Sequence, residues 1–313
     1  MALKEFDIIV IGGGPAGLTA AMYASRSRMK TALIEKMGCG GQAAIADWME
    51  NYPGFPEGIS GFDLGQKFEE QAKKFGAEII LDEISALSKT GDGFKIATAG
   101  GEYSAQAVII ASGANHKPLN IPGEKEFIGK GVSYCATCDG PFFRSREVAV
   151  IGGGNSAAQE AIYLTKFASQ VTLIHRRDRL RATKILQERA FENPKLKIVW
   201  NAVPEAITGT EQVEELKLRD VKTNEAKALS VKGVFIFVGL EPNTKFLSDI
   251  IKLDESGYIP TDDNMLTSTP GIFACGDVRV KLLRQVVTAA GDGALAAFSA
   301  QEYIDELKGT RYK

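Results

Sequence analysis

Residues 6–36, "FDIIVIGGGPAGLTAAMYASRSRMKTALIEK", carry the pattern from which the fold class can be predicted. It predicts a buried strand of isoleucine and valine, a glycine turn, a helix and a second strand. Gly12, Gly14 and Gly17 occupy the glycine positions of a G-x-G-x-x-G turn, and Glu35 closes the second strand. Because a strand precedes the turn and a helix follows it, we interpret the turn as a dinucleotide-binding site. The glutamate stands where an acid accepts a hydrogen bond from a ribose 2′-OH.

The same unit returns in the middle of the chain as "EVAVIGGGNSAAQEAIYLTKFASQVTLIH", residues 147–175. Gly152, Gly154 and Ala157 take the glycine positions, and His175 takes the place of the acid, all at one constant offset. A single glycine turn of this kind is often only a tight connection between a strand and a helix. Two of them in the same context indicate a duplicated nucleotide-binding domain.

A second pair of similar segments supports this duplication. Residues 108–119 and 234–247 both run from an apolar strand into glycine and then proline. We therefore expect an α/β fold of two Rossmann-like domains, the second inserted into the first. The first domain is discontinuous and comprises residues 1–116 and 245–313, whereas the second comprises residues 117–244. The linkers that connect them are expected around Pro118 and in residues 241–246.

Composition narrows the class of protein. The 313 residues carry a formal net charge of −2, which argues against general nucleic-acid binding. No apolar stretch approaches the roughly 18 residues needed to span a membrane, and the N-terminus does not resemble a signal peptide. We expect a cytoplasmic enzyme that has no membrane or nucleic-acid partner.

The two turns are followed by residues of opposite charge. Glu35 suits an unphosphorylated ribose, as in FAD or NAD. His175 begins "HRRDRLRA", so that Arg176, Arg177 and Arg181 extend a cationic cluster at the equivalent place. Guanidinium groups bind phosphate through several charge-assisted donors, and the 2′-phosphate of NADPH offers the acceptors. We therefore expect FAD in the first domain and NADPH in the second, although a basic run can also be a solvated surface.

The stretch "YCATCDGP", residues 134–141, carries a C-x-x-C pair, Cys135 and Cys138. A structural zinc site needs about four ligands, and the remaining cysteines are the isolated Cys39 and Cys275, so no metal site is expected. A structural disulfide is disfavoured in a reducing compartment. We interpret the pair as a redox dithiol and Asp139 as its candidate proton donor or acceptor. An Asp-Gly turn at a loop end is the alternative reading of that aspartate.

The motifs "VIGGGPAG", "NYPGF", "YCATCDG", "GGGNSA", "HRR…RA" and "CGDV…RQVVTAAGDG" occur in order along nearly the whole chain. This combination resembles the low-molecular-weight thioredoxin reductases. The resemblance implies FAD in the discontinuous domain, NADPH in the inserted domain and a homodimer. It also implies that electrons pass from NADPH through FAD to a Cys135–Cys138 disulfide, and then to thioredoxin or a thioredoxin-like protein. Cys138 matches the thiol nearest the flavin, and Asp139 matches the family's acid/base position.

The turns and the resemblance together give two sets of expected cofactor contacts. Those for FAD are Gly12, Gly14, Pro15, Ala16, Gly17, Glu35, Gly41, Gln42, Asn51, Gly113, Gly276, Asp277, Arg284, Gln285 and Val286. Those for NADPH are Gly152, Gly154, Asn155, Ser156, His175, Arg176, Arg177 and Arg181. One departure from the family is Gln159, which stands beside Glu160 where the family usually has two acids.

Three alternatives remain open at this point. The nucleotide could be NADH, the acceptor could be a glutaredoxin-like protein or a peroxiredoxin module, and the chain could be a redox sensor without turnover. In each case the C-x-x-C pair and the nicotinamide site lie in one domain and serve a flavin bound mainly by the other. We therefore expect the NADPH domain to rotate about linkers 113–118 and 241–246.

Overall fold

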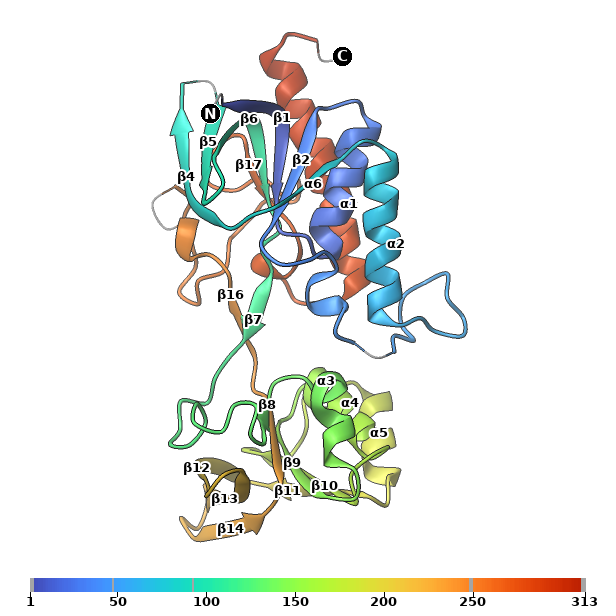
Figure 1. Ribbon diagram of the computed structural model, residues 1–313, viewed down its shortest axis with the longest axis vertical. Helices are drawn as coiled ribbons and strands as arrows, with labels where there is room; N and C mark the ends of the chain where they lie inside the picture. Colours follow the sequence, from blue (N-terminus) through green and yellow to red (C-terminus); the bar gives the residue numbers. More distant parts are fainter. Residues whose placement is uncertain (1–2, 47, 92, 248–249, 311–313) are drawn as a thin grey trace. The chain divides into compact units, whose positions relative to one another are not determined.

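The structure is a computed structural model that describes residues 3–46, 48–91, 93–247 and 250–310, with the backbone alone for residues 137 and 138. The chain forms two compact units. Unit 1 comprises Met1–Asn115 and Glu241–Lys313, and unit 2 comprises His116–Leu240. Each unit has a sheet with a parallel core, and helices accompany both sheets, which confirms the predicted α/β class (Figure 1). Among the described helices, none is long and apolar enough to cross a membrane.

The sheet of unit 1 has seven described strands in the order β3-β2-β1-β6-β5-β4, with β17 also paired to β6. Their bounds are β1 Lys4–Ile11, β2 Thr31–Glu35, β3 Glu78–Leu81, β4 Ile84–Thr90, β5 Gly93–Thr98, β6 Glu102–Ile110 and β17 Ile272–Ala274. β3, β2, β1, β6 and β17 run parallel, whereas β4 and β5 pair antiparallel. The first half of β6 pairs with β5, and its last residues pair with β17. The chain therefore returns to the first sheet after unit 2.

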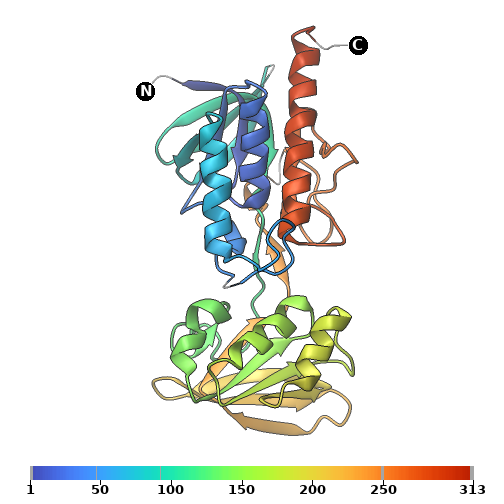
Figure 2. The same cartoon turned by 90° about the vertical axis from the view of Figure 1, so that its right-hand side faces the viewer.

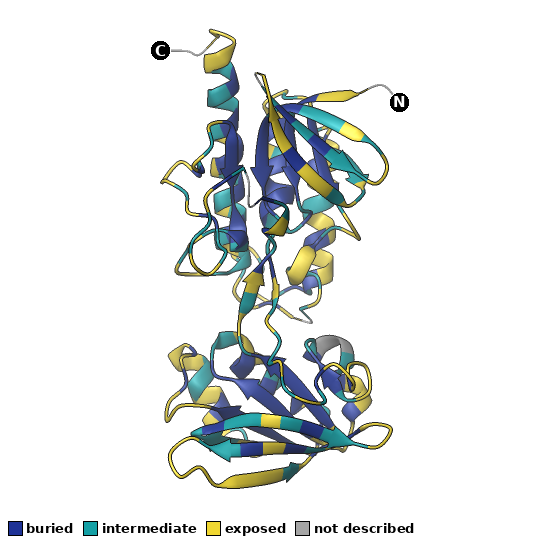
Figure 3. Ribbon diagram, turned by 90° about the vertical axis from the view of Figure 1, so that its left-hand side faces the viewer, coloured by how far each residue is buried: buried dark blue, intermediate teal, exposed yellow. Residues whose placement is uncertain are grey.

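Three helices pack together along this sheet, as Figure 2 shows: α1 Pro15–Arg26, α2 Gly61–Lys74 and α6 Val286–Leu307. Successive side chains of a strand point to opposite faces, and β1 is buried on both. Ile8 and Val10 join the core under the helices, and Ile9 and Ile11 join the core on the other face. The central strands are accordingly buried (Figure 3). This double burial explains why the strand reads as a continuous apolar run.

Unit 2 repeats the parallel arrangement with the strand order β11-β10-β9-β15-β8. Its strands are β8 Val132–Ser133, β9 Glu147–Gly152, β10 Gln170–His175, β11 Leu196–Trp200 and β15 Gly233–Phe237. A separate antiparallel sheet contains β12 Ala202–Gly209, β13 Val213–Asp220 and β14 Ala226–Ser230. The helices are α3 Ala136–Asp139, α4 Asn155–Leu164 and α5 Lys184–Glu192. Their apolar side chains join those of β9, β10 and β15 in one core.

The chain passes twice between the units. The outgoing segment contains β7, Ala114–His116, and the returning segment contains β16, Leu240–Pro242. These two short strands pair with each other. Within unit 1, the backbone N–H of Asn243 donates to the carbonyl of Gly113 at 3.0 Å. The two crossing segments are therefore hydrogen-bonded rather than independent.

Candidate functional site

The first glycine turn joins β1 to α1 and leaves no room for a side chain at Gly12 or Gly17. Gly12 has φ 107°, and a Cβ at this position would lie 2.4 Å from the carbonyl oxygen of Ala111. A Cβ at Gly17 would lie 1.9 Å from the carbonyl oxygen of Gly12. Pro15 occupies the start of the helix, where its missing N–H costs nothing. The backbone amides at the start of α1 are therefore available to an anion such as a pyrophosphate.

Glu35 lies at the end of β2 and contacts this turn directly. One carboxylate oxygen accepts from the backbone N–H of Gly13 at 2.7 Å, and the other accepts from Met37 at 3.1 Å. Each oxygen keeps acceptor capacity beyond the bond it makes. The expected ribose acceptor is therefore held in a fixed orientation at the edge of the glycine turn.

Two other segments converge on the start of α1. A Cβ at Gly41 would lie 2.9 Å from the Cα of Gly14, so the short helix η1, Gly41–Ala43, lies against the turn and brings Gln42 with it. A Cβ at Gly276 would lie 2.8 Å from the Cβ of Ala16. Three distant stretches of sequence thus meet at the N-terminus of α1. Each of them contains residues that are expected to contact FAD.

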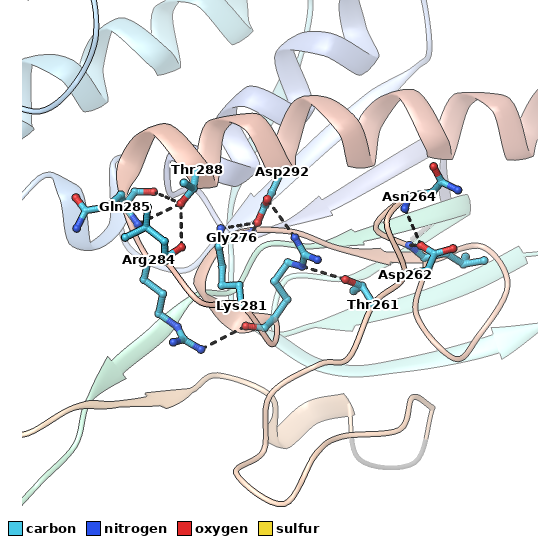
Figure 4. Close-up of polar contacts among 12 residues, drawn as sticks. Thr261, Asp262, Asn264, Gly276, Lys281, Arg284, Gln285, Thr288 and Asp292 are labelled. Carbon is cyan, nitrogen blue, oxygen red and sulfur yellow. Dashed lines mark hydrogen bonds and ion pairs between the residues drawn. The ribbon is translucent and has the colours of Figure 1, made fainter.

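A polar network in the C-terminal part of unit 1 holds the loop that contains Gly276 (Figure 4). Asp292, inside α6, accepts from the N–H of Gly276 at 3.1 Å and from Lys281 Nζ at 2.7 Å. Its other oxygen lies 3.1 Å from Arg279 Nη1, and Arg279 Nε donates to the hydroxyl of Thr261 at 3.0 Å. The network fixes the backbone on both sides of Asp277.

Asp277 is the polar group that this loop leaves without a partner. Its Oδ1 atom is buried and accepts no hydrogen bond within the described part of the chain. Burial is the main cause that raises the pKa of this carboxyl group. An unsatisfied buried acceptor is costly unless a donor arrives. The position therefore fits a hydroxyl-bearing ligand such as the ribityl chain of a flavin nucleotide.

Arg284, Gln285 and Asn51 come together next to the same loop. The guanidinium of Arg284 lies 4.3 Å from the ring centre of Tyr258, and its N–H groups donate to the carbonyls of Asp277 and Arg279, each at 3.4 Å. The side-chain amide of Asn51 donates to Gln285 Oε1 at 2.8 Å. Gln285 also caps α6, which begins at Val286. The expected FAD contacts Asn51, Arg284 and Gln285 therefore lie beside the loop of Asp277. Gly113 follows Ser112, whose Cα would lie 3.0 Å from a Cβ at Gly12.

The second glycine turn, in unit 2, has the same construction. A Cβ at Gly152 would lie 2.5 Å from that of Ala157, and Asn155 and Ser156 begin α4. The arginine-bearing loop is tied to this turn, because the N–H of Arg181 donates to the carbonyl of Gly153 at 2.7 Å. The side chain of Asn155 accepts from the N–H of Thr183 at 2.8 Å.

His175 and the arginines occupy different environments. Arg176, Arg177 and Arg181 are exposed. His175 is 4% exposed and lies beneath the turn, where a Cβ at Gly153 would meet its ring at 2.2 Å. Burial lowers the pKa of His175, so the ring is neutral at pH 7. The positive charge of this site comes from the arginines, whereas the histidine supports the turn and keeps a buried, unpartnered Nε2 among the described residues.

Cys135 is disulfide-bonded and precedes the short helix α3. Its carbonyl accepts from the backbone N–H of Asp139 at 3.1 Å, and its N–H donates to Ser133 Oγ at 3.0 Å. Asp139 is partly buried. The side chain of Cys138, expected to be the other half of the pair, lies outside the described side chains. The redox segment is thus an ordered turn of helix rather than an open loop.

The other two cysteines are free thiols. Cys275 is fully buried, and burial raises its pKa. Burial, with the charges of Glu69 and Glu35, raises the pKa of Cys39 to about 12. Both stay protonated at neutral pH and are weak nucleophiles. In the described part of the chain, no three acidic, histidine or cysteine side chains are grouped to hold a metal ion.

Three supporting residues escaped sequence reasoning: Asp292, Tyr258 and Glu124. Glu124 binds the hydroxyl of Tyr134, immediately before Cys135. The signal for Asp292 was present, since it is the first acid in an otherwise apolar helical stretch from residue 286. Tyr258 and Glu124 lie in turn-rich segments where nothing in the sequence reveals their partners.

Comparison with known proteins agrees with this geometry. The sequence profile of the pyridine nucleotide-disulphide oxidoreductase family matches residues 6–293. The thioredoxin reductase of Treponema pallidum is 50% identical over 304 residues, which cover 97% of this chain and 99% of that protein. The thioredoxin reductase of Bacillus subtilis is 50% identical over 309 residues, covering 98% and 97%. The crystal structure of Lactococcus lactis thioredoxin reductase superposes with a TM-score of 0.94 at 48% identity, covering 96% of this chain and 99% of that one. The chain belongs to the pyridine nucleotide-disulphide oxidoreductases, and within them to the thioredoxin reductases, which makes it a flavoprotein disulfide reductase.

Proposed function

We propose that this enzyme takes electrons from NADPH and delivers them through FAD and the Cys135–Cys138 disulfide to thioredoxin. The observation that carries the proposal is the combination of two nucleotide turns with a disulfide-bonded Cys135 in unit 2. One turn is bordered by the carboxylate of Glu35, and the other by exposed arginines. The thioredoxin reductases that resemble this chain support the choice of acceptor.

Unit 1 is proposed as the FAD-binding domain, expected at residues 1–116 and 245–313. Bound FAD would accept a hydride from the nicotinamide and donate electrons to the disulfide. The N-terminal amides of α1 would hold the pyrophosphate and Glu35 the adenosine ribose. The buried Oδ1 of Asp277 would accept from a hydroxyl group, which would satisfy this unpartnered oxygen. Arg284, Gln285 and Asn51 would line the same region.

Unit 2 is proposed as the NADPH-binding domain, expected at residues 117–244. Arg176, Arg177 and Arg181 would bind the 2′-phosphate, and the amides at the start of α4 would bind the pyrophosphate. The hydrogen bond from Arg181 to Gly153 supports this assignment, because it ties the arginine loop to the glycine turn. An enzyme specific for NADH would not need these cations to bind a 2′-phosphate.

The cysteine pair is proposed as the outlet for electrons. Reduction of the disulfide takes up two electrons and two protons, breaks the S–S bond and leaves two thiols. Asp139, partly buried at the end of α3, would supply and accept a proton at the thiol nearest the flavin, Cys138. The reduced pair would then attack a disulfide of thioredoxin and return to its oxidised state.

Both units take part in the proposed transfer of electrons. Unit 2 would rotate about linkers 113–118 and 241–246, so that the nicotinamide site and the cysteine pair serve the flavin in turn. A crosslink between the units would block one of the two transfers. The protein would act as a homodimer in the cytoplasm, where the free thiols of Cys39 and Cys275 stay reduced.

The test of the acceptor follows NADPH oxidation in the presence of thioredoxin and insulin. Turnover that depends on thioredoxin supports the proposal. A glutaredoxin-like protein or a peroxiredoxin module in place of thioredoxin tests the alternative acceptors. If electrons from NADPH reach a dye but no thiol protein, the protein is a flavoenzyme and thioredoxin is not its acceptor.

A further inference from the structure

Glu124 is a buried carboxylate in the segment between β7 and β8 of unit 2. The residue is only 1% exposed. One oxygen accepts from the backbone N–H of Leu119 at 2.8 Å, and the other accepts from Asn120 at 2.6 Å. The hydroxyl of Tyr134 donates to the first oxygen at 2.5 Å. Two backbone N–H groups and the Tyr134 hydroxyl therefore surround this buried side chain.

The segment around Glu124 is itself anchored to the rest of unit 2. Gly123 has φ 85°, and a Cβ there would lie 1.9 Å from the carbonyl oxygen of Ile207 in β12. The N–H of Ile207 donates to the carbonyl of Pro122 at 2.9 Å. Phe127, which follows on the same segment, is buried in the core between the two sheets. The backbone around Glu124 is therefore anchored, and the Glu124 carboxyl group holds the hydroxyl of Tyr134 in place.

Tyr134 connects Glu124 to the segment that contains Cys135 and Cys138. Its ring stacks on His116 with centroids 6.3 Å apart and an interplanar angle of 29°. Burial and the bond to Glu124 raise the pKa of Tyr134, so its hydroxyl remains a donor over the whole physiological range. The next residue, Cys135, is tied by its N–H and carbonyl to the hydroxyl of Ser133. Ser133 belongs to β8, which pairs with β15.

We propose that Glu124 is a positioning residue for the redox pair, which holds the backbone of Cys135 through Tyr134 at the geometry that the disulfide requires. The inference rests on the proposed function, in which Cys135 and Cys138 cycle between disulfide and dithiol. A pre-ordered backbone raises the effective concentration of one sulfur at the other and so favours the closed disulfide. Reduction adds two electrons and two protons to the sulfurs, whereas Glu124 forms no bond to sulfur and acts through Tyr134 alone.

The experiment measures the thiol–disulfide equilibrium of the holoenzyme in glutathione buffers of stepped reduced-to-oxidised ratio, read by alkylation and mass. Tyr134→Phe removes the donor and leaves Glu124 its two backbone partners. Glu124→Gln replaces one of the two acceptor oxygens by an NH2 group, which donates and cannot accept. Since each change removes a hydrogen bond to a carboxylate, both should shift the midpoint towards the dithiol by about ten-fold. The double variant should shift no further than Glu124→Gln alone, because both act through one bond.

The matched control is Asp220→Asn. Asp220, also in unit 2, accepts two backbone N–H bonds, from Lys222 at 2.9 Å and Thr223 at 3.1 Å, and belongs to the antiparallel sheet. This change should lower the melting temperature and leave the midpoint unchanged. If the variants at Glu124 and Tyr134 behave like this control, their role is merely structural and the inference is wrong. If Glu124→Gln does not fold, the midpoint of Tyr134→Phe alone tests the inference. A wild-type enzyme without a reversible dithiol would contradict the proposed function itself and the inference with it.

Discussion

Asp292 accepts a hydrogen bond from the backbone N–H of Gly276 at 3.1 Å, and this contact joins the interior of α6 to the loop that bears Asp277. The same carboxylate binds Lys281 and Arg279, whose side chains are 9% and 14% exposed. The loop is thus held by a nearly buried network of charges rather than by backbone pairing alone. Its position matters because Asp277 presents the unsatisfied oxygen of the proposed flavin site.

Asp292→Asn should loosen this loop. Removal of one charge leaves Arg279 and Lys281 without their shared partner, and breaking a buried pair in this way costs about 3–5 kcal/mol. We expect a lower melting temperature and faster loss of FAD, measured by the fluorescence of released flavin. The control is Glu102→Gln, which removes the exposed ion pair with Lys95. An exposed pair of this kind contributes little, so a control as damaging as Asp292→Asn would contradict the role of the network.

Asp277→Asn should have opposite effects on the empty and the loaded protein. Burial raises the folded-state pKa of Asp277 above its unfolded value, so its contribution to stability is full at low pH and lost as the pH rises through the folded pKa. The asparagine variant avoids the cost of the buried charge. Flavin-stripped Asp277→Asn should therefore be more stable than the flavin-stripped wild type at pH 7, and the advantage should vanish below about pH 4.

In the loaded enzyme the same change should weaken FAD binding, because an amide replaces the carboxylate acceptor. We expect at least about a ten-fold higher dissociation constant, as for loss of a charge-assisted hydrogen bond. Calorimetric titration of the stripped protein with FAD measures it. Unchanged affinity together with unchanged stability would show that Oδ1 faces no ligand.

Arg176→Ala should change the choice of nucleotide rather than the rate of chemistry. Loss of one guanidinium removes charge-assisted donors to the 2′-phosphate, so the KM for NADPH should rise about ten-fold while that for NADH stays constant. Steady-state kinetics with both nucleotides and a dye acceptor gives the answer. Lys197→Ala, at an exposed position on β11, is the control for loss of a positive charge. Equal changes in both KM values would contradict the phosphate assignment.

Gly17→Ala should damage the first nucleotide turn through one methyl group. Its Cβ would lie 1.9 Å from the carbonyl oxygen of Gly12, and the backbone on both sides is fixed by β1 and α1. Overpacking of this kind costs about 1–3 kcal/mol, and the displaced turn should also lose FAD. Thermal unfolding and the flavin-to-protein absorbance ratio report the two effects. Gly38→Ala, where nothing lies within 4 Å of the new Cβ, should be close to neutral.

The sequence predicted the α/β class and the two glycine turns well, because these depend on local signals. Buried strands of isoleucine and valine, and glycines with no room for a side chain, are readable one after another along the chain. The environment of His175 was not readable in this way. Its place beside three arginines suggested a cation, whereas the fold buries it beneath Gly153 and lowers its pKa.

The contacts of the supporting residues could not be predicted from the sequence for a different reason. Glu124 and Tyr134 are ten residues apart, and Asp292 and Gly276 are sixteen apart across a turn and a helix. Each pair meets only after tertiary packing, and nothing in the sequence shows that its two members touch. Burial of the carboxylate and the identity of its donors become visible only in three dimensions.

The most direct test of the account compares the wild type with Cys135→Ser for NADPH oxidation, once with thioredoxin and insulin and once with a dye that accepts electrons from the flavin. We predict that the variant keeps NADPH-dependent dye reduction within about two-fold of the wild type and loses thioredoxin reduction by at least about 1,000-fold, because no disulfide can form at that position. Thioredoxin reduction that persists in Cys135→Ser would contradict the claim that electrons leave through this pair.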